Sequence, residues 1–340
     1  MASTQTKYLE FRQYRDFGEV LNATFEFITK NFGNFFKVVF SIAGPFFILG
    51  TAVLGLFGYR ILNNAIGSNV RRTMRYGYSE DTMAYTDIIL LVVCGLVILL
   101  GMIALYLSIY GFIKIYMEKK SDDITVAEVF QFVKQNALRY IGSLLVLIFM
   151  FGIVISMIVL IMVAGVGGIG GFLVFILFML FFAIFIYQSL FFAIVAFEDV
   201  NPFEAVVRGF QIVAGHWWFT LGIAFVLGFL NTILNSLVQY SAAAIIGIIG
   251  YNSYDDAPYW LLRIGFVSFA VLVGIMFIFI SSITVIKNAV LYFSFVEKKD
   301  SVGLFEKIQA LGGAHPGQEH EIKVERSKQQ YTNEETDEEF

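Results

Sequence analysis

The chain alternates between long apolar runs and shorter polar stretches, and six of the apolar runs are about 20 residues long or longer. About 20 apolar residues in a helix cross the ~30 Å hydrocarbon core of a bilayer, where only helices and closed barrels satisfy their backbone hydrogen bonds. The pattern predicts an all-α, polytopic membrane protein with six transmembrane helices. We expect these spans at residues 38–58, 88–112, 143–163, 172–197, 219–240 and 264–286.

A glycine-rich break separates the third expected span from the fourth. Without it, the apolar stretch would be far longer than a membrane is thick. Glycine adopts positive φ freely and therefore suits a tight turn between two helices. We expect a helical hairpin at Gly165, Gly167, Gly168, Gly170 and Gly171.

One short pattern occurs three times, as TFEFITKN at 24–31, VFQFVKQN at 129–136 and GFQIVAGH at 209–216. Upstream of each copy stands a polar residue followed three positions later by Glu, which is the capping box that starts a helix. The capping pairs are Asp16 with Glu19, Thr125 with Glu128, and Asn201 with Glu204. The positions that define the motif are Phe25, Asn31, Phe130, Asn136, Phe210 and His216.

The first copy shows a helical periodicity of apolar residues. Val20, Thr24, Phe25, Ile28 and Phe32 recur at intervals of three and four, while polar residues occupy the opposite face. An aromatic amphipathic helix just before a span is expected to lie in the headgroup region with its apolar face toward the bilayer. Similar stripes at 126–133 and 203–213 predict two more such helices.

The chain therefore divides into three units in parallel, each an interfacial helix followed by a transmembrane hairpin. Units at 16–118, 122–198 and 201–297 follow a segment at 1–15 and precede a tail at 298–340, which we expect to be disordered from about 310. Chance similarity among Phe-rich segments is the alternative explanation of the repeat. Fifteen Lys and Arg residues near the spans fall on the side of the motif and five on the other, which predicts that both termini are cytoplasmic.

The amino-acid composition is typical of a membrane protein and does not indicate a particular catalytic or binding chemistry. The 340 residues are 58% hydrophobic and 15% charged, whereas a soluble chain carries roughly 25% charged residues. Cys94 is the only cysteine, which excludes a disulfide or a thiolate metal cluster within one chain. His315 and His320 stand in the predicted tail and supply no defined metal geometry. We expect no cofactor, no metal and no nucleic-acid partner.

The segment AFEDVNPFEAVVRGFQIVAGHWWFTLGIAFVLGFL at 196–230 resembles the membrane domain found with some glycerophosphoryl diester phosphodiesterases and its stand-alone bacterial relatives. The opening FGEVLNATFEFITKNF at 17–32 is similar to the N-terminus of the same family. The resemblance implies a six-span protein of the bacterial inner membrane. It does not carry over phosphodiesterase activity, because the sequence contains no stretch long enough for the soluble catalytic domain.

Polar side chains within the later spans could line a path for a solute or form hydrogen bonds between packed helices. Asn231, Asn235 and Gln239 stand four residues apart and share one helical face. Amides in hydrocarbon face the bundle interior, where they bond neighbouring helices or line a wet cavity. We name this set the polar seam, and its members are Asn231, Asn235, Gln239, Gln188, Ser281 and Thr284.

The sequence contains no nucleophile elbow, P-loop or zinc motif. The leading hypothesis is a non-enzymatic membrane protein that serves as a scaffold or accessory factor for lipid or protein partners through its interfacial helices. The alternative is a transporter or channel for a small or lipidic solute along the polar seam. A membrane-embedded lipid enzyme is a third possibility, which rests on the resemblance alone.

Overall fold

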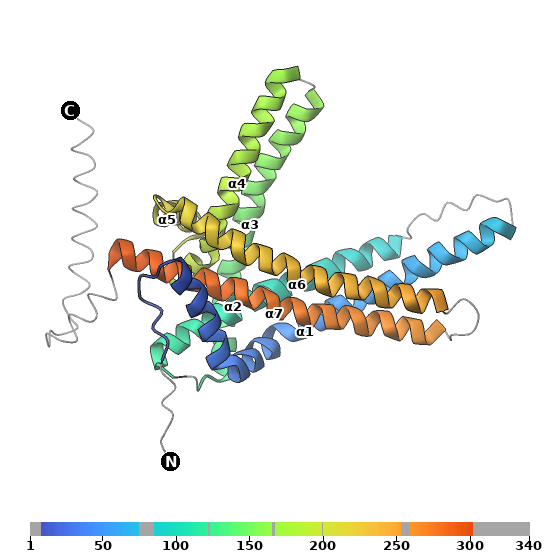
Figure 1. Cartoon of the computed structure of the whole chain (residues 1–340), viewed down its shortest axis with the longest axis horizontal. Coiled ribbons are helices and arrows are strands. Elements are labelled where there is room, and N and C mark those ends of the chain that lie inside the picture. The colour runs from blue at the N-terminus through green and yellow to red at the C-terminus, as the bar shows by residue number, and fades with distance from the viewer. Residues whose placement is uncertain are drawn as a thin grey trace, which may run out of the picture. The chain divides into compact units, whose positions relative to one another are not determined.

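Seven helices account for the secondary structure of the computed structural model, which describes residues 8–74, 85–121, 123–164, 167–198, 200–252 and 259–301 (Figure 1). No strand occurs in these ranges. Residues 1–7 and the predicted tail from 302 onward lie outside them. The helices are α1 (Phe17–Met74), α2 (Tyr85–Lys119), α3 (Val126–Ala164), α4 (Gly167–Phe197), α5 (Pro202–Val213), α6 (Trp217–Asn252) and α7 (Tyr259–Asp300).

Five helices in the described part of the chain are long and apolar enough to cross a membrane. They are α1, α2, α3, α6 and α7, and each contains one of the expected spans. The expected span at 172–197 lies in α4, where the described apolar stretch runs from Gly170 to Met179. The helical content and the long apolar helices confirm an all-α fold that is consistent with a multi-pass membrane protein.

Antiparallel hairpins connect α1 with α2, α3 with α4, and α6 with α7 (Figure 1). Small residues allow close approach, because a Cβ on Gly50 of α1 would lie 2.5 Å from Ile98 of α2. Likewise, a Cβ on Gly274 of α7 would lie 2.8 Å from Thr51 of α1. A break between α3 and α4 lies where the glycine-rich stretch predicted one, since α3 ends at Ala164 and α4 begins at Gly167. Four of the five glycines expected in the turn, Gly167, Gly168, Gly170 and Gly171, belong to α4 instead, and Gly165 lies outside the described residues.

Two of the three predicted interfacial helices are continuous with the spans that follow them. α1 runs without interruption from Phe17 to Met74, and α3 from Val126 to Ala164. Only the third copy forms a separate helix, α5, because the chain turns at Ala214 and Gly215 before α6 begins. Gly215 has a φ of 81°, a left-handed conformation that side chains disfavour. The other two copies contain no such turn.

A long continuous buried stretch lies in the C-terminal part of α7, within the compact unit formed by residues 1–295. Every residue from Val285 to Phe295 is buried, including the polar Lys287, Asn288 and Ser294. Many side chains along α2 and α3 are instead exposed and apolar, as expected for helices that face lipid. The core therefore lies where α2, α4 and α7 approach their C-terminal ends. We call this region the collar end, defined by the start of α1, α3 and α5 and by the described connections between 119 and 126 and between 197 and 202.

Candidate functional site

The three predicted capping boxes are present at the collar end. The backbone N–H of Asp16 donates to Glu19 Oε2 at 2.9 Å, and the N–H of Glu19 donates to Asp16 Oδ1 at 2.8 Å. Thr125 and Glu128 make the same reciprocal pair at 3.1 and 3.4 Å. The N–H of Asn201 donates to Glu204 Oε2 at 3.2 Å, and Pro202 occupies the first helical position. Each box satisfies backbone donors that a helix start leaves unpaired.

The three motif copies also share one pattern of burial. The residue before each motif Phe is buried, namely Thr24, Val129 and Gly209. The motif residue itself is exposed, by 42% for Phe25, 55% for Phe130 and 38% for Phe210. Three positions further on, Ile28, Val133 and Val213 are again buried. Each copy therefore packs against protein on one side and leaves one aromatic ring outside.

The apolar face predicted to lie on the bilayer is divided between protein and surface in α1. Val20, Thr24 and Ile28 are buried by other parts of the chain, whereas Phe25 and Phe32 are exposed. Phe27, which the helical periodicity did not single out, is fully buried and makes edge-to-face contacts with several rings. Most of this face is consequently part of the core, and a smaller part is available to lipid.

The last motif position has one role in the first two copies and another in the third. Asn31 Nδ2 donates to the carbonyl of Phe27, and Asn136 Nδ2 donates to the carbonyl of Phe132, each at 2.9 Å and one turn back. His216 instead stands just before α6, where its carbonyl accepts the N–H of Thr220 at 3.0 Å. Its ring lies 5.1 Å from that of Phe295. His216 therefore occupies the cap position of α6.

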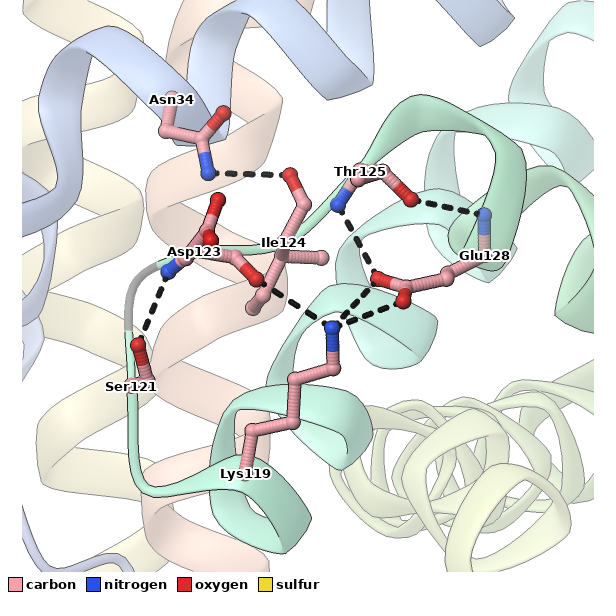
Figure 2. A network of polar contacts seen from close by, with 7 residues as sticks. All are labelled: Asn34, Lys119, Ser121, Asp123, Ile124, Thr125 and Glu128. Atoms are coloured by element: carbon pink, nitrogen blue, oxygen red, sulfur yellow. Dashed lines mark hydrogen bonds and ion pairs between the residues drawn. The ribbon is translucent and has the colours of Figure 1, made fainter.

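The connection between α2 and α3 is held to α1 by a polar network (Figure 2). Lys119 Nζ donates to both carboxylate oxygens of Glu128, at 2.7 and 2.9 Å, and to the carbonyl of Asp123 at 3.3 Å. Asn34 Nδ2 of α1 donates to the carbonyl of Ile124 at 3.0 Å. Because Glu128 is also the capping residue of α3, one carboxylate fixes both the helix start and the end of α2.

The segment at 8–16 packs into the collar end, which sequence reasoning did not predict. The N–H of Leu9 donates to the hydroxyl of Tyr116 at 3.0 Å, and the N–H of Arg15 donates to Ser294 Oγ at 2.9 Å. Phe11 is almost fully buried among Phe27, Tyr116 and Phe293. The segment thus ties α1, α2 and α7 together. Its only visible signal was the presence of Leu9 and Phe11 in a polar stretch.

Arg15 is a buried cation that is bonded chiefly to backbone. Its guanidinium donates to the carbonyls of Phe11 at 2.9 Å and Gln13 at 3.3 Å, and also to the carbonyl of Glu10. Burial lowers the pKa of this guanidinium, although the charge of Glu19 acts in the opposite direction. Arginine remains protonated at any physiological pH, so Arg15 retains its charge within the collar end.

Glu198 joins three helices, α4, α5 and α7. Its carboxylate accepts hydrogen bonds from Arg208 Nε of α5, at 3.1 and 3.3 Å, and from the Tyr292 hydroxyl of α7, at 2.9 Å. Glu198 itself follows the last residue of α4. Sequence reasoning missed this bridge, because its partners lie 10 and 94 residues away. Asp199 lies outside the described residues.

The second helices of the three hairpins meet at the collar end. Tyr110 of α2 packs edge-to-face on Phe197 of α4, with ring centroids 5.5 Å apart. Phe197 in turn stacks on Tyr292 of α7 at 5.5 Å and contacts Phe293 at 4.7 Å. Aromatic contacts therefore join α2, α4 and α7 where the three helices converge.

The polar seam is partly an interhelical contact. Asn231 Nδ2 of α6 donates to Thr284 Oγ1 of α7 at 3.1 Å, which joins two members of the predicted set. Asn235 Nδ2 donates to the carbonyl of Asn231 at 2.8 Å, within its own helix. Gln239 is exposed and Ser281 is half-buried. The side chain of Gln188 lies outside the described residues.

The described residues contain no group of three or more His, Cys, Asp and Glu side chains that could hold a metal ion. Cys94 is buried and donates to the carbonyl of Gly50 at 3.0 Å. Comparison of the chain with known protein families, with curated proteins and with solved structures finds no match. The resemblance to the phosphodiesterase-associated membrane domain stays a prediction.

Proposed function

We propose that the chain is a six-span integral membrane protein of three parallel units, whose collar end holds lipid or protein partners at the cytoplasmic surface of a bacterial inner membrane. The observation that carries this proposal is the exposure of Phe25, Phe130 and Phe210 at equivalent places in the three motif copies. Soluble surfaces seldom repeat an exposed aromatic ring in this way, whereas interfacial helices use such rings as anchors.

A rigid base supports the three exposed rings. The capping boxes define where the helices begin, and the bridge at Glu198 and the network at Lys119 fix the chain between hairpins. Exposed Lys37 and Lys134 stand on the same helices as the motif rings. Lysines at this depth attract anionic headgroups, each by about 1 kcal/mol. Fixed rings and nearby cations suit a surface that holds other components in place.

Three features support the parallel repeat. The capping boxes, the burial of the motif positions and the convergence of α2, α4 and α7 each recur once per unit. α4 supplies the sixth span of this proposal, since its 31 residues correspond to about 46 Å of helix. An even number of spans per unit returns each motif copy to the same side of the membrane.

A conduit along the polar seam has less support. The side chains of Asn231 and Thr284 are hydrogen-bonded to each other, so they do not line an open path for a solute. This bond makes two members of the polar seam a contact between α6 and α7, which favours a scaffold over a transporter.

The test replaces Phe25, Phe130 and Phe210 by Asp, singly and together. A carboxylate in place of an interfacial ring opposes membrane seating, and a loss of about 1–2 kcal/mol changes cellular abundance severalfold. We expect each variant to lower the amount of chain in the membrane fraction and the amount of phospholipid or cross-linked partner recovered with it. Thr29→Asp and Gln131→Asp, at exposed polar positions of the same helices, serve as controls. Full abundance and unchanged partners in the triple variant would contradict the proposal.

A further inference from the structure

One charged residue stands within an exposed apolar stripe along α3. Phe130, Leu138, Leu145 and Phe149 are between 55% and 82% exposed, and Lys134, which is also exposed, lies between the first two. Neighbours in this series are four or seven residues apart, so the five side chains lie on one side of the helix. We call them the α3 stripe. It begins at the motif ring of the second copy and runs into the expected span at 143–163.

No acidic side chain of α3 neutralises the charge of Lys134. Glu128 is the one acidic residue of this helix. Its carboxylate accepts hydrogen bonds from Lys119 Nζ and from the backbone N–H of Thr125, so it is committed to the helix start. Lys134 makes no hydrogen bond or ion pair with the described residues. Its ammonium group therefore extends from the stripe without a partner in the described part of the chain.

The cations of the other two copies are placed differently. Arg208 of the third copy donates to the carboxylate of Glu198, at 3.1 and 3.3 Å, so its charge is balanced within the chain. Lys37 of α1 is exposed and has no partner among the described residues. At about 100° of rotation per residue, however, it stands roughly 120° around the helix from Phe25. The second copy therefore combines an unpaired cation and the motif ring on one face.

We propose that the α3 stripe binds an anionic phospholipid, with Lys134 at the headgroup phosphate and with Phe130 and Leu138 beside the glycerol and the upper acyl chains. A lysine stem lies along apolar surface while its ammonium group stays among polar groups, which suits the boundary between headgroups and hydrocarbon. A zwitterionic headgroup carries its own ammonium, which offsets its phosphate, so a lysine favours a lipid with net negative charge. The proposal rests on the proposed function in one respect, the placement of the second motif copy at the membrane surface.

Photo-cross-linking in the full-length protein tests the proposal. The photoreactive residue p-benzoylphenylalanine replaces Leu138, which is 82% exposed and stands one turn beyond Lys134. The protein is reconstituted in vesicles of phosphatidylethanolamine with a minor share of phosphatidylglycerol, and mass spectrometry identifies the lipid adducts after irradiation. We expect phosphatidylglycerol to be enriched among the adducts about fivefold over its share of the bilayer, as an attraction of about 1 kcal/mol per lysine implies.

Variants separate a local site from general electrostatic attraction. Lys134→Gln should return the adducts at position 138 to the composition of the bilayer, whereas Lys134→Arg should retain the enrichment because it keeps the charge. Lys37→Gln is the matched control, since it removes the same charge from another exposed position and leaves the α3 stripe intact. A second probe at Val207, which is 57% exposed and adjacent to the charge-balanced Arg208, should show no enrichment in any of these variants.

The proposal would be overturned if the adducts at position 138 matched the bilayer composition in the chain that retains Lys134, or if Lys134→Gln left their enrichment unchanged. An equal loss in Lys37→Gln, or cross-links to protein in place of lipid, would also overturn it. Each result is distinguishable from failure of the proposed function, which is judged by the membrane abundance of the Asp variants at Phe25 and Phe210. Those residues lie outside the α3 stripe.

Discussion

At the scale of single residues, Glu198 connects more elements than any predicted site residue. It stands at the end of α4 and receives hydrogen bonds from Arg208 of α5 and Tyr292 of α7. The ion pair is only partly exposed, with 25% of the Arg208 side chain and 19% of the Glu198 side chain accessible. Such a pair is less screened by water than an exposed one, so its loss leaves a charge without its partner.

We expect Glu198→Gln to destabilise the protein by about 1.5–3 kcal/mol, the range for hydrogen bonds to charged groups. Tyr292→Phe should cost less, because it removes one of the three hydrogen bonds that Glu198 accepts. Thermal unfolding in detergent measures both. A double-mutant cycle of Glu198→Gln with Arg208→Gln should give a coupling of about 0.5–3 kcal/mol. Additive effects would show that the two side chains stabilise the protein independently.

Residue contacts were predictable from the sequence when both partners lay within one helical turn. The capping boxes at Asp16, Thr125 and Asn201 are examples, because their geometry follows from a spacing of three residues. Arg15 and Ser294 are 279 residues apart, and no spacing rule connects them. For the polar seam, periodicity identified the shared face of Asn231 and Asn235, but it could not show that only Asn231 reaches Thr284.

At the scale of elements, α5 differs from the corresponding parts of α1 and α3. The sequence predicted three similar interfacial helices, and the structure shows one separate helix and two that continue into spans. The difference lies in Gly215, whose φ of 81° ends the third helix. The isolated Gly33 and Gly142 are accommodated within α1 and α3, because a helical glycine lowers stability without preventing the helix.

Gly215→Ala should destabilise the connection between α5 and α6. A left-handed conformation costs an L-residue roughly 1–2 kcal/mol, and no nearby atom restricts the added Cβ, so backbone strain alone produces the effect. Gly142→Ala is the control, since it adds the same methyl group within a helix and in open space. Chemical unfolding of both variants measures the difference. Equal stability would show that residue 215 can change its conformation without cost.

At the scale of the whole molecule, the apolar runs in the sequence predicted the helices. Only the structure shows that the hairpins converge at one packed end. Hydrophobicity reports burial without distinguishing lipid from protein, so it could not separate exposed Phe25 from buried Phe27. Nor could it show that Val285–Phe295 lies inside the bundle, since an apolar helix surrounded by protein and one surrounded by lipid have similar sequences.

The proposed arrangement of six spans with a cytoplasmic collar end makes a prediction about access from each side of the membrane. Cys94 is the sole cysteine and is buried, so Cys94→Ser provides a background for single cysteines. A membrane-impermeant maleimide applied to intact spheroplasts should label cysteines introduced at Tyr85, at Gly168 near the start of α4, and at Asp255, which lies outside the described residues. Each of these positions stands between the two spans of one unit.

Cysteines at Thr29, Gln131 and Gln211, which are exposed on the three motif helices, should react only after permeabilisation. Labelling of Gly168→Cys from the same side as Gln131→Cys and Gln211→Cys would show that the α3–α4 hairpin does not cross the membrane. Labelling of all three motif positions from outside would instead invert the orientation while preserving the parallel units. If one motif position were labelled from the opposite side of the membrane to the other two, the result would contradict the repeat. Two spans per unit must return every copy of the motif to the same side.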